Sequence, residues 1–149
     1  MRSLMTVIMV LLLASLAQAA TGLVAIKSPH SVADTADRLE AALKAKGMTI
    51  FNRIDHAAGA ASVGAELRPT QLVIFGNPKI GTPLMQCSQS IGIDLPQKAL
   101  IWQDAAGQTW FGYNDPHYLA ERHQLQGCQE VLDKVAGALN NFALAATKP

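Results

Sequence analysis

The sequence has no run of basic residues, no acidic tail and no low-complexity repeat. Its 12 Lys and Arg residues nearly balance its 11 Asp and Glu residues. Proteins bind phosphate backbones through clustered Lys and Arg side chains, so this balance argues against a nucleic-acid partner.

Familiar catalytic and metal-binding signatures are also missing. The sequence contains no His-Glu-x-x-His, no Gly-x-Ser-x-Gly and no paired-cysteine zinc pattern. His117 and His123 lie six positions apart, and on one helix they would point about 240° away from each other. We therefore expect no metal site. A metal or haem carrier built from His56 with His117 or Met85 stays open as an alternative.

Residues 1–19 have the three parts of a secretory signal peptide. Arg2 is positively charged, residues 4–13 form an apolar run broken by one threonine, and residues 17–19 offer small side chains to signal peptidase. The apolar run is shorter than the roughly 20 residues of a membrane-spanning helix, which disfavours an uncleaved anchor. We predict cleavage before Ala20, a secreted or periplasmic mature chain, and no membrane anchor after cleavage.

Cys87 and Cys128 are the two cysteines of the chain. An even count in an exported chain is most simply one disulfide, here Cys87 with Cys128. It would close a loop of about 41 residues, for which the chain-entropy model gives roughly 4 kcal/mol. The alternatives are two buried thiols and a metal or redox pair. The last is disfavoured because there is no Cys-x-x-Cys spacing.

Hydrophobic periodicity predicts alternating strands and helices. We expect strands over residues 23–27, 48–54, 72–75, 98–103 and 109–113. In the second strand Met48, Ile50 and Ile54 alternate with Thr49, Phe51, Arg53 and Asp55, which is the period of two that a strand shows. We expect helices over residues 32–46, 83–91 and 131–142, a further helix after Pro116, and one or two helical turns within residues 57–67.

Local signals indicate where several of these elements begin and end. Ser31 can cap the first long helix, and Gly47 suits its left-handed exit. Thr82 is expected to cap a later helix with Pro83 at its first position. Residues 104–107 form the turn of a hairpin. The order predicts an α+β domain, a two-layer fold with a mainly antiparallel sheet and helices packed on one face.

Two strand ends carry the residues that we select as candidate ligand-binding residues, His56, Asn77 and Thr82. Asp55 and His56 end the second strand, and Asn77 and Thr82 flank a turn that leads into a helix. The simplest interpretation is structural, with His56 bonded to backbone and the other two shaping the turn. The functional hypothesis is one concave site that all three residues line. Antiparallel pairing of the two strands would separate their ends.

Several motifs follow one another in chain order. They are Asp55-His56-Ala57-Ala58-Gly59-Ala60 with Gly64, then Leu72-Val73-Ile74-Phe75-Gly76-Asn77-Pro78 with Gly81-Thr82-Pro83-Leu84-Met85, then Leu95-Pro96 before a hairpin that contains Tyr113-Asn114-Asp115-Pro116. Together they resemble the family catalogued as domain of unknown function 302. The resemblance implies a two-layer fold of strand, helix, four strands and helix, and a homodimer. It implies no established reaction, and a fold alone supplies none.

We therefore expect an exported, non-enzymatic ligand-binding or interaction module with a small ligand or partner. The first alternative is a small enzyme that uses His56 as acid or base, and the second is the metal or haem carrier. The sequence indicates no particular cofactor and no particular ligand.

Overall fold

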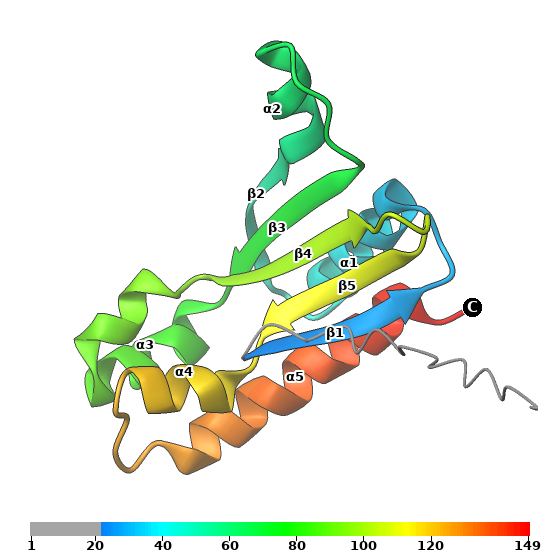
Figure 1. The fold of residues 1–149 in the computed structure, drawn as a ribbon. Helices are drawn as coiled ribbons and strands as arrows, with labels where there is room; N and C mark the ends of the chain where they lie inside the picture. The colour runs from blue at the N-terminus through cyan, green and yellow to red at the C-terminus, as the bar shows by residue number, and fades with distance from the viewer. Residues whose placement is uncertain (1–21) are drawn as a thin grey trace, which may run out of the picture.

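The computed structural model describes residues 22–149, and the predicted signal peptide lies outside them. Figure 1 shows the fold. In chain order its elements are β1 (Leu23–Ser28), α1 (Val32–Ala45), β2 (Thr49–Asp55), α2 (His56–Ser62), β3 (Thr70–Gly76), α3 (Pro78–Cys87), the 3₁₀ helix η1 (Gln89–Ile93), β4 (Gln97–Gln103), β5 (Thr109–Asn114), α4 (Pro116–Arg122) and α5 (Gln129–Thr147).

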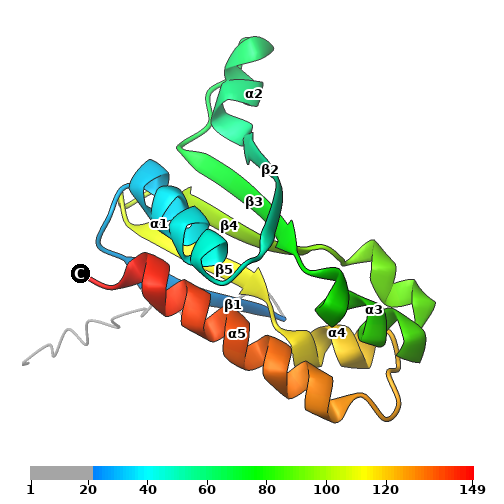
Figure 2. The same ribbon diagram turned by 180° about the vertical axis from the view of Figure 1, so that it is seen from behind.

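The five strands form one antiparallel sheet in the order β1-β5-β4-β3-β2. Helices α1 and α5 pack side by side on one face of this sheet, as Figures 1 and 2 show from opposite sides. Helix α2 projects from one end of the sheet, whereas α3, η1 and α4 lie at the other end. The expected two-layer α+β fold with helices on one face is confirmed.

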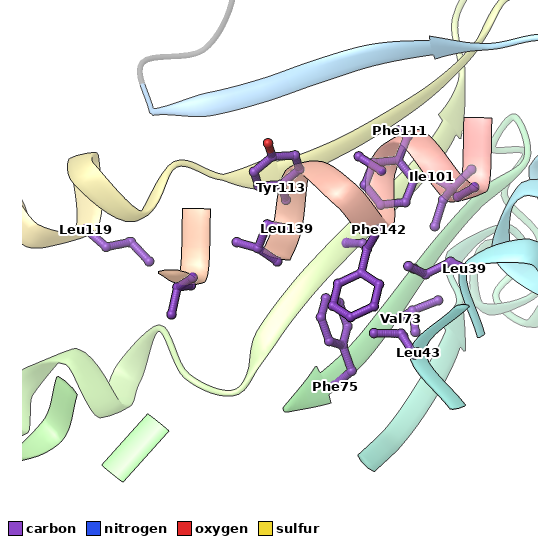
Figure 3. Close-up of a cluster of buried hydrophobic side chains, with 14 of the residues drawn as sticks. Leu39, Leu43, Val73, Phe75, Ile101, Phe111, Tyr113, Leu119, Leu139 and Phe142 are labelled. Atoms are coloured by element: carbon purple, nitrogen blue, oxygen red, sulfur yellow. The ribbon is translucent and has the colours of Figure 1, made fainter. Parts of the chain in front are cut away.

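The core lies between the sheet and the two long helices, and Figure 3 shows part of it. Leu39 and Leu43 of α1 and Phe75 of β3 are fully buried there. The ring of Phe142 from α5 meets the ring of Phe75 edge to face, with 6.1 Å between ring centroids. Each such side chain contributes roughly 1.5–3 kcal/mol of hydrophobic free energy, so this layer holds α1 and α5 on the sheet.

Two expected local signals operate as predicted. The Ser31 hydroxyl accepts a hydrogen bond from the Asp34 amide and begins α1. In the β4–β5 hairpin the Asp104 carboxylate accepts from the amides of Ala106 and Gln108, which closes the turn. Both interactions join residues close in sequence, and therefore the sequence alone could indicate them.

The start of α3 differs from the prediction. The helix begins at Pro78 rather than Pro83, and its N-cap is Asn77 rather than Thr82. The Asn77 side chain accepts a hydrogen bond from the Lys79 amide at 2.9 Å. Asn77 and Pro78 thus have the same roles, N-cap and first helical residue, that were expected of Thr82 and Pro83. Pro83 instead lies inside the helix. The helix ends at Cys87, and η1 follows as a separate element.

Strand β2 also departs from the expected alternation. Its register with β3 shifts between Ile50 and Asn52, so Phe51 is an extra residue and is 55% exposed. One added residue reverses which face the following side chains occupy. Arg53 consequently pairs with buried Val73 on the helix-covered face, and Ile54 lies on the uncovered face, contrary to the period-two prediction.

Candidate functional site

An apolar pocket of about 330 Å³ opens where β3 ends. Its walls come from the end of β3, from α3, from the segment around Leu95 and from α5. Apolar side chains make up most of the lining, among them Met48, Phe75, Leu84, Met85, Leu95 and Phe142. We call this the apolar pocket. Its size and composition are those of small-molecule sites in proteins.

Three polar side chains, those of Asn77, Thr82 and Gln97, interrupt the apolar lining. Asn77 lies at the pocket because it caps α3 and uses its side-chain oxygen for that cap. Within residues 22–149 its amide nitrogen donates no hydrogen bond to protein, so it can serve a ligand. Asn77 and Thr82 are therefore brought together at one pocket.

His56 lies at the opposite end of the sheet. Strands β2 and β3 are antiparallel, and Asp55 pairs with Gln71 whereas Thr49 pairs with Gly76. His56 follows the first pair and Asn77 the second, so the seven residues of β3 separate them by about 20 Å. Within one chain, therefore, His56 does not share a pocket with Asn77 and Thr82, because the antiparallel pairing separates the strand ends.

The Asp55 carboxylate has a structural role. Asp55 caps α2 by accepting a hydrogen bond from the Ala58 amide at 2.9 Å, and it accepts another from Gln71 Nε2 at 3.2 Å. These bonds, the Ala58 amide first, lower the pKa of Asp55. Neither bond involves His56, which is exposed at the first position of α2. Nothing here aligns His56 with Asp55 as an acid–base pair.

The other candidate metal ligands are dispersed. His117 Nε2 lies 3.8 Å from Asp133, whereas Met85 lines the apolar pocket at the far end of the sheet from His56. Among the residues described, no three His, Cys, Asp or Glu side chains gather closely enough to share a metal ion. The structure therefore does not assemble either of the carrier sites considered from the sequence.

Cys87 and Cys128 lie at disulfide distance, with their Cα atoms 6.6 Å apart. Cys87 is the last residue of α3, and Cys128 directly precedes α5. A bond between them would tie α3 to the start of α5, two elements that both line the apolar pocket.

Sequence reasoning missed a second polar cluster, formed by Asp94, His123 and Ser90. Asp94 Oδ2 lies 2.5 Å from His123 Nε2, and His123 Nδ1 lies 2.9 Å from Ser90 Oγ. Ser90 belongs to η1 and His123 follows α4, so 33 positions separate them in sequence. No short motif marks such a pair, because tertiary packing creates it.

Comparison with known proteins identifies the family of the chain and a solved structure with a similar fold. The family described as "Domain of unknown function DUF302" matches residues 24–142. The chain belongs to this family. A crystal structure of an uncharacterised conserved DUF302 protein from Bacillus stearothermophilus superimposes with a TM-score of 0.76 and 19% sequence identity, covering 85% of this chain and 99% of that one. At that identity the likeness shows the shared DUF302 fold.

Curated relatives of this DUF302 chain carry the name "Fluoride-specific ion channel". FluC 1 of Brucella suis biovar 1 (strain 1330) is 52% identical over 105 residues, which are 70% of this chain and 41% of that protein. FluC 2 of Brucella melitensis biotype 1 is 52% identical over 105 residues and 39% of its length. The chain thus matches about two fifths of these relatives. In residues 22–149, no helix combines the length and apolarity that a membrane crossing requires.

Proposed function

We propose that this DUF302 domain is a binding module that holds a small, largely apolar molecule in the apolar pocket. The observation that supports this most directly is the pocket itself, about 330 Å³ with three polar side chains in its lining. An apolar ligand gains free energy by leaving water, and a few polar groups fix its orientation. The Asn77 amide and the Thr82 hydroxyl would bind a carbonyl or hydroxyl at one end of the ligand.

The lining also favours binding over chemistry within this pocket. General acid–base catalysis requires a titratable side chain within hydrogen-bond reach of the substrate. No Asp, Glu, His, Lys, Arg, Tyr or Cys is among the residues that line the apolar pocket. The ligand would therefore be held unchanged, and a charged ligand would be disfavoured because no counter-charge lines its binding place.

A pocket-filling variant tests this function. N-phenyl-1-naphthylamine, an uncharged fluorescent probe, should bind the wild-type protein, and 1-decanol should displace it. Ala138→Phe places a ring in the pocket and should abolish probe binding, because Ala138 is part of the lining. Asn140→Phe adds the same ring to the exposed side of α5 and serves as the control. Equal probe binding by wild type and Ala138→Phe would refute the proposal.

We propose further that the domain is exported. The signal-like residues 1–19 support this, and so does a cysteine pair at disulfide distance, since disulfides persist in oxidising compartments. N-terminal sequencing of the protein from its native host should find a start within about two residues of Ala20. A mature chain that retains Met1 would refute export by this route.

We also propose a homodimer that forms through the uncovered face of the sheet. The register aligns Ile54, Leu72 and Leu100 in one row on this face, opposite the side that α1 and α5 cover. Trp102 and Trp110 lie beside them and stack with 6.3 Å between ring centroids. We call these five residues the apolar sheet face. Contiguous apolar surface of this kind is characteristic of protein interfaces.

A further inference from the structure

The cluster of Asp94, His123 and Ser90 forms one line of hydrogen bonds. The His123 side chain is 6% exposed and the Asp94 side chain 12%, whereas Ser90 is exposed. The imidazole is thus enclosed between a nearly buried carboxylate and a hydroxyl that solvent can reach. None of the three residues lines the apolar pocket, so this cluster is a separate site.

The two contacts of His123 place one ring nitrogen at Asp94 and the other at the Ser90 hydroxyl. When Nε2–H donates to Asp94, Nδ1 has no proton and can accept the hydrogen of the Ser90 hydroxyl. Arg122 holds the second carboxylate oxygen of Asp94 at 3.2 Å and restrains its rotation. A hydroxyl, an imidazole and an orienting carboxylate in this order make an activated nucleophile.

The cysteine pair lies close to both ends of this cluster. Cys87 precedes Ser90 by three positions, and Cys128 follows His123 by five. A bond between the cysteines would join the same two chain segments that the Ser90–His123 contact joins. Such a covalent tie would hold the hydroxyl and the imidazole in place, which is the rigid support that a catalytic pair requires.

A groove lies next to the cluster in the chain: Gln89, the residue before Ser90, lines it, Ser90 itself does not, and no lining residue is charged. Residues from the end of α3 and the start of η1 line it, including Thr82, Gln86, Ser88 and Gln89. A phosphate ester would find no cation in this groove, whereas a neutral ester would lose little hydration there. The groove therefore favours an uncharged carboxylic ester as substrate.

We propose that Ser90 is a nucleophile, that His123 is its general base, and that this site hydrolyses small uncharged carboxylic esters. The Ser90 oxygen forms a bond to the acyl carbon while His123 Nδ1 takes the hydroxyl proton. The carbon–oxygen bond to the alcohol then breaks, and the alcohol leaves with that proton. Water, losing a proton to His123, attacks the acyl-serine, and the carboxylic acid leaves as Ser90 regains its proton.

Covalent labelling and hydrolysis test this proposal on the purified protein. Diisopropyl fluorophosphate should modify Ser90, as peptide mass spectrometry would locate. Ser90→Ala should abolish the labelling and slow p-nitrophenyl acetate hydrolysis about 100-fold or more, the lower end for loss of such catalysis. His123→Asn should do the same. Asp94→Asn should lower kcat with KM unchanged, because Asp94 orients His123 and does not touch the ester.

Matched serine variants separate this chemistry from background reactivity. Ser62 of α2 is also exposed and lies at the other end of the sheet, so Ser62→Ala should retain full labelling and full hydrolysis. Ser90→Ala removes only a surface hydroxyl, and an unchanged urea midpoint would show that the fold persists. Labelling elsewhere, or hydrolysis by Ser90→Ala at the wild-type rate, would overturn the proposal. Ser90, His123 and Asp94 do not line the apolar pocket, so their variants should bind N-phenyl-1-naphthylamine as the wild type does, and the two proposals can fail separately.

Discussion

The indole of Trp102 on β4 lies directly over Gly112 on β5. A Cβ atom added to Gly112 would lie 2.8 Å from a ring carbon of Trp102 and 3.3 Å from a methyl carbon of Leu23. The ring thus occupies the space that a side chain on β5 would need. This contact joins the middle of the sheet to its edge, because Leu23 belongs to β1.

We predict that Gly112→Ala destabilises the fold by about 1–3 kcal/mol, since the indole must move and lose its packing. Gly137→Ala is the matched control. Gly137 lies on α5 with nothing within 4 Å of an added Cβ, so its replacement should stabilise the helix by about 0.5–1 kcal/mol. Urea unfolding at neutral pH measures both free energies. A Gly112→Ala midpoint at or above that of the wild type would contradict the packing argument.

The capping bond of Asp55 should give acid-dependent stability. Hydrogen bonds from Ala58 and Gln71 lower the pKa of Asp55 in the folded protein below its unfolded value. A lowered folded pKa means that this stability is fully present above the unfolded pKa, about 3.9, and is lost as pH falls through the folded pKa. Asp55→Ala should therefore lower the urea midpoint at pH 7 and less so at acidic pH.

Asp55→Asn provides the control for that experiment. Asparagine caps helices about as well as aspartate but does not titrate, so this variant should keep most of the stability at pH 7. Its urea midpoint should then fall less than that of the wild type between pH 5 and pH 2. Identical pH profiles for wild type and Asp55→Asn would show that the Asp55 charge has no part in stability.

The sequence predicted elements that depend on neighbours in the chain and missed those that depend on pairing. Ser31 begins α1 through a bond three residues away, so its role was readable. The extra residue Phe51 in β2 is defined only by the register with β3, and the pattern of β2 alone misassigned Ile54. The same distinction applies to the candidate site residues. Asn77 and Thr82 follow one strand and stay together, whereas the antiparallel pairing places His56 elsewhere.

The apolar sheet face should determine the oligomeric state. Two sheets packed face to face lie about 10 Å apart, and a charge in the centre of such an interface would be buried without a partner. Leu100→Arg should therefore convert a dimer into a monomer while the fold persists, since a monomer exposes that face to water. Size-exclusion chromatography with light scattering measures the molar mass of the wild type and of each variant. Leu144→Arg, at a 51% exposed position on α5, should leave the dimer intact. A monomeric wild type at micromolar concentration would refute the dimer.

The cysteine pair yields the last prediction. If Cys87 and Cys128 are bonded, the protein purified under oxidising conditions will weigh two hydrogens less than after reduction. Breaking the bond frees a loop with a sequence separation of 41 residues, and the chain-entropy model predicts that the free energy of unfolding falls by up to roughly 4 kcal/mol.

The double variant Cys87→Ser with Cys128→Ser should match the reduced wild type in its urea midpoint, because both lack the same constraint. Reductant should have no effect on the double variant, which controls for other actions of the reductant. Because the pair flanks the Ser90–His123 contact, reduction should also slow the labelling of Ser90. If the protein purified under oxidising conditions has the same mass as the reduced protein, Cys87 and Cys128 are free thiols. The proposal of export would then be supported by residues 1–19 alone.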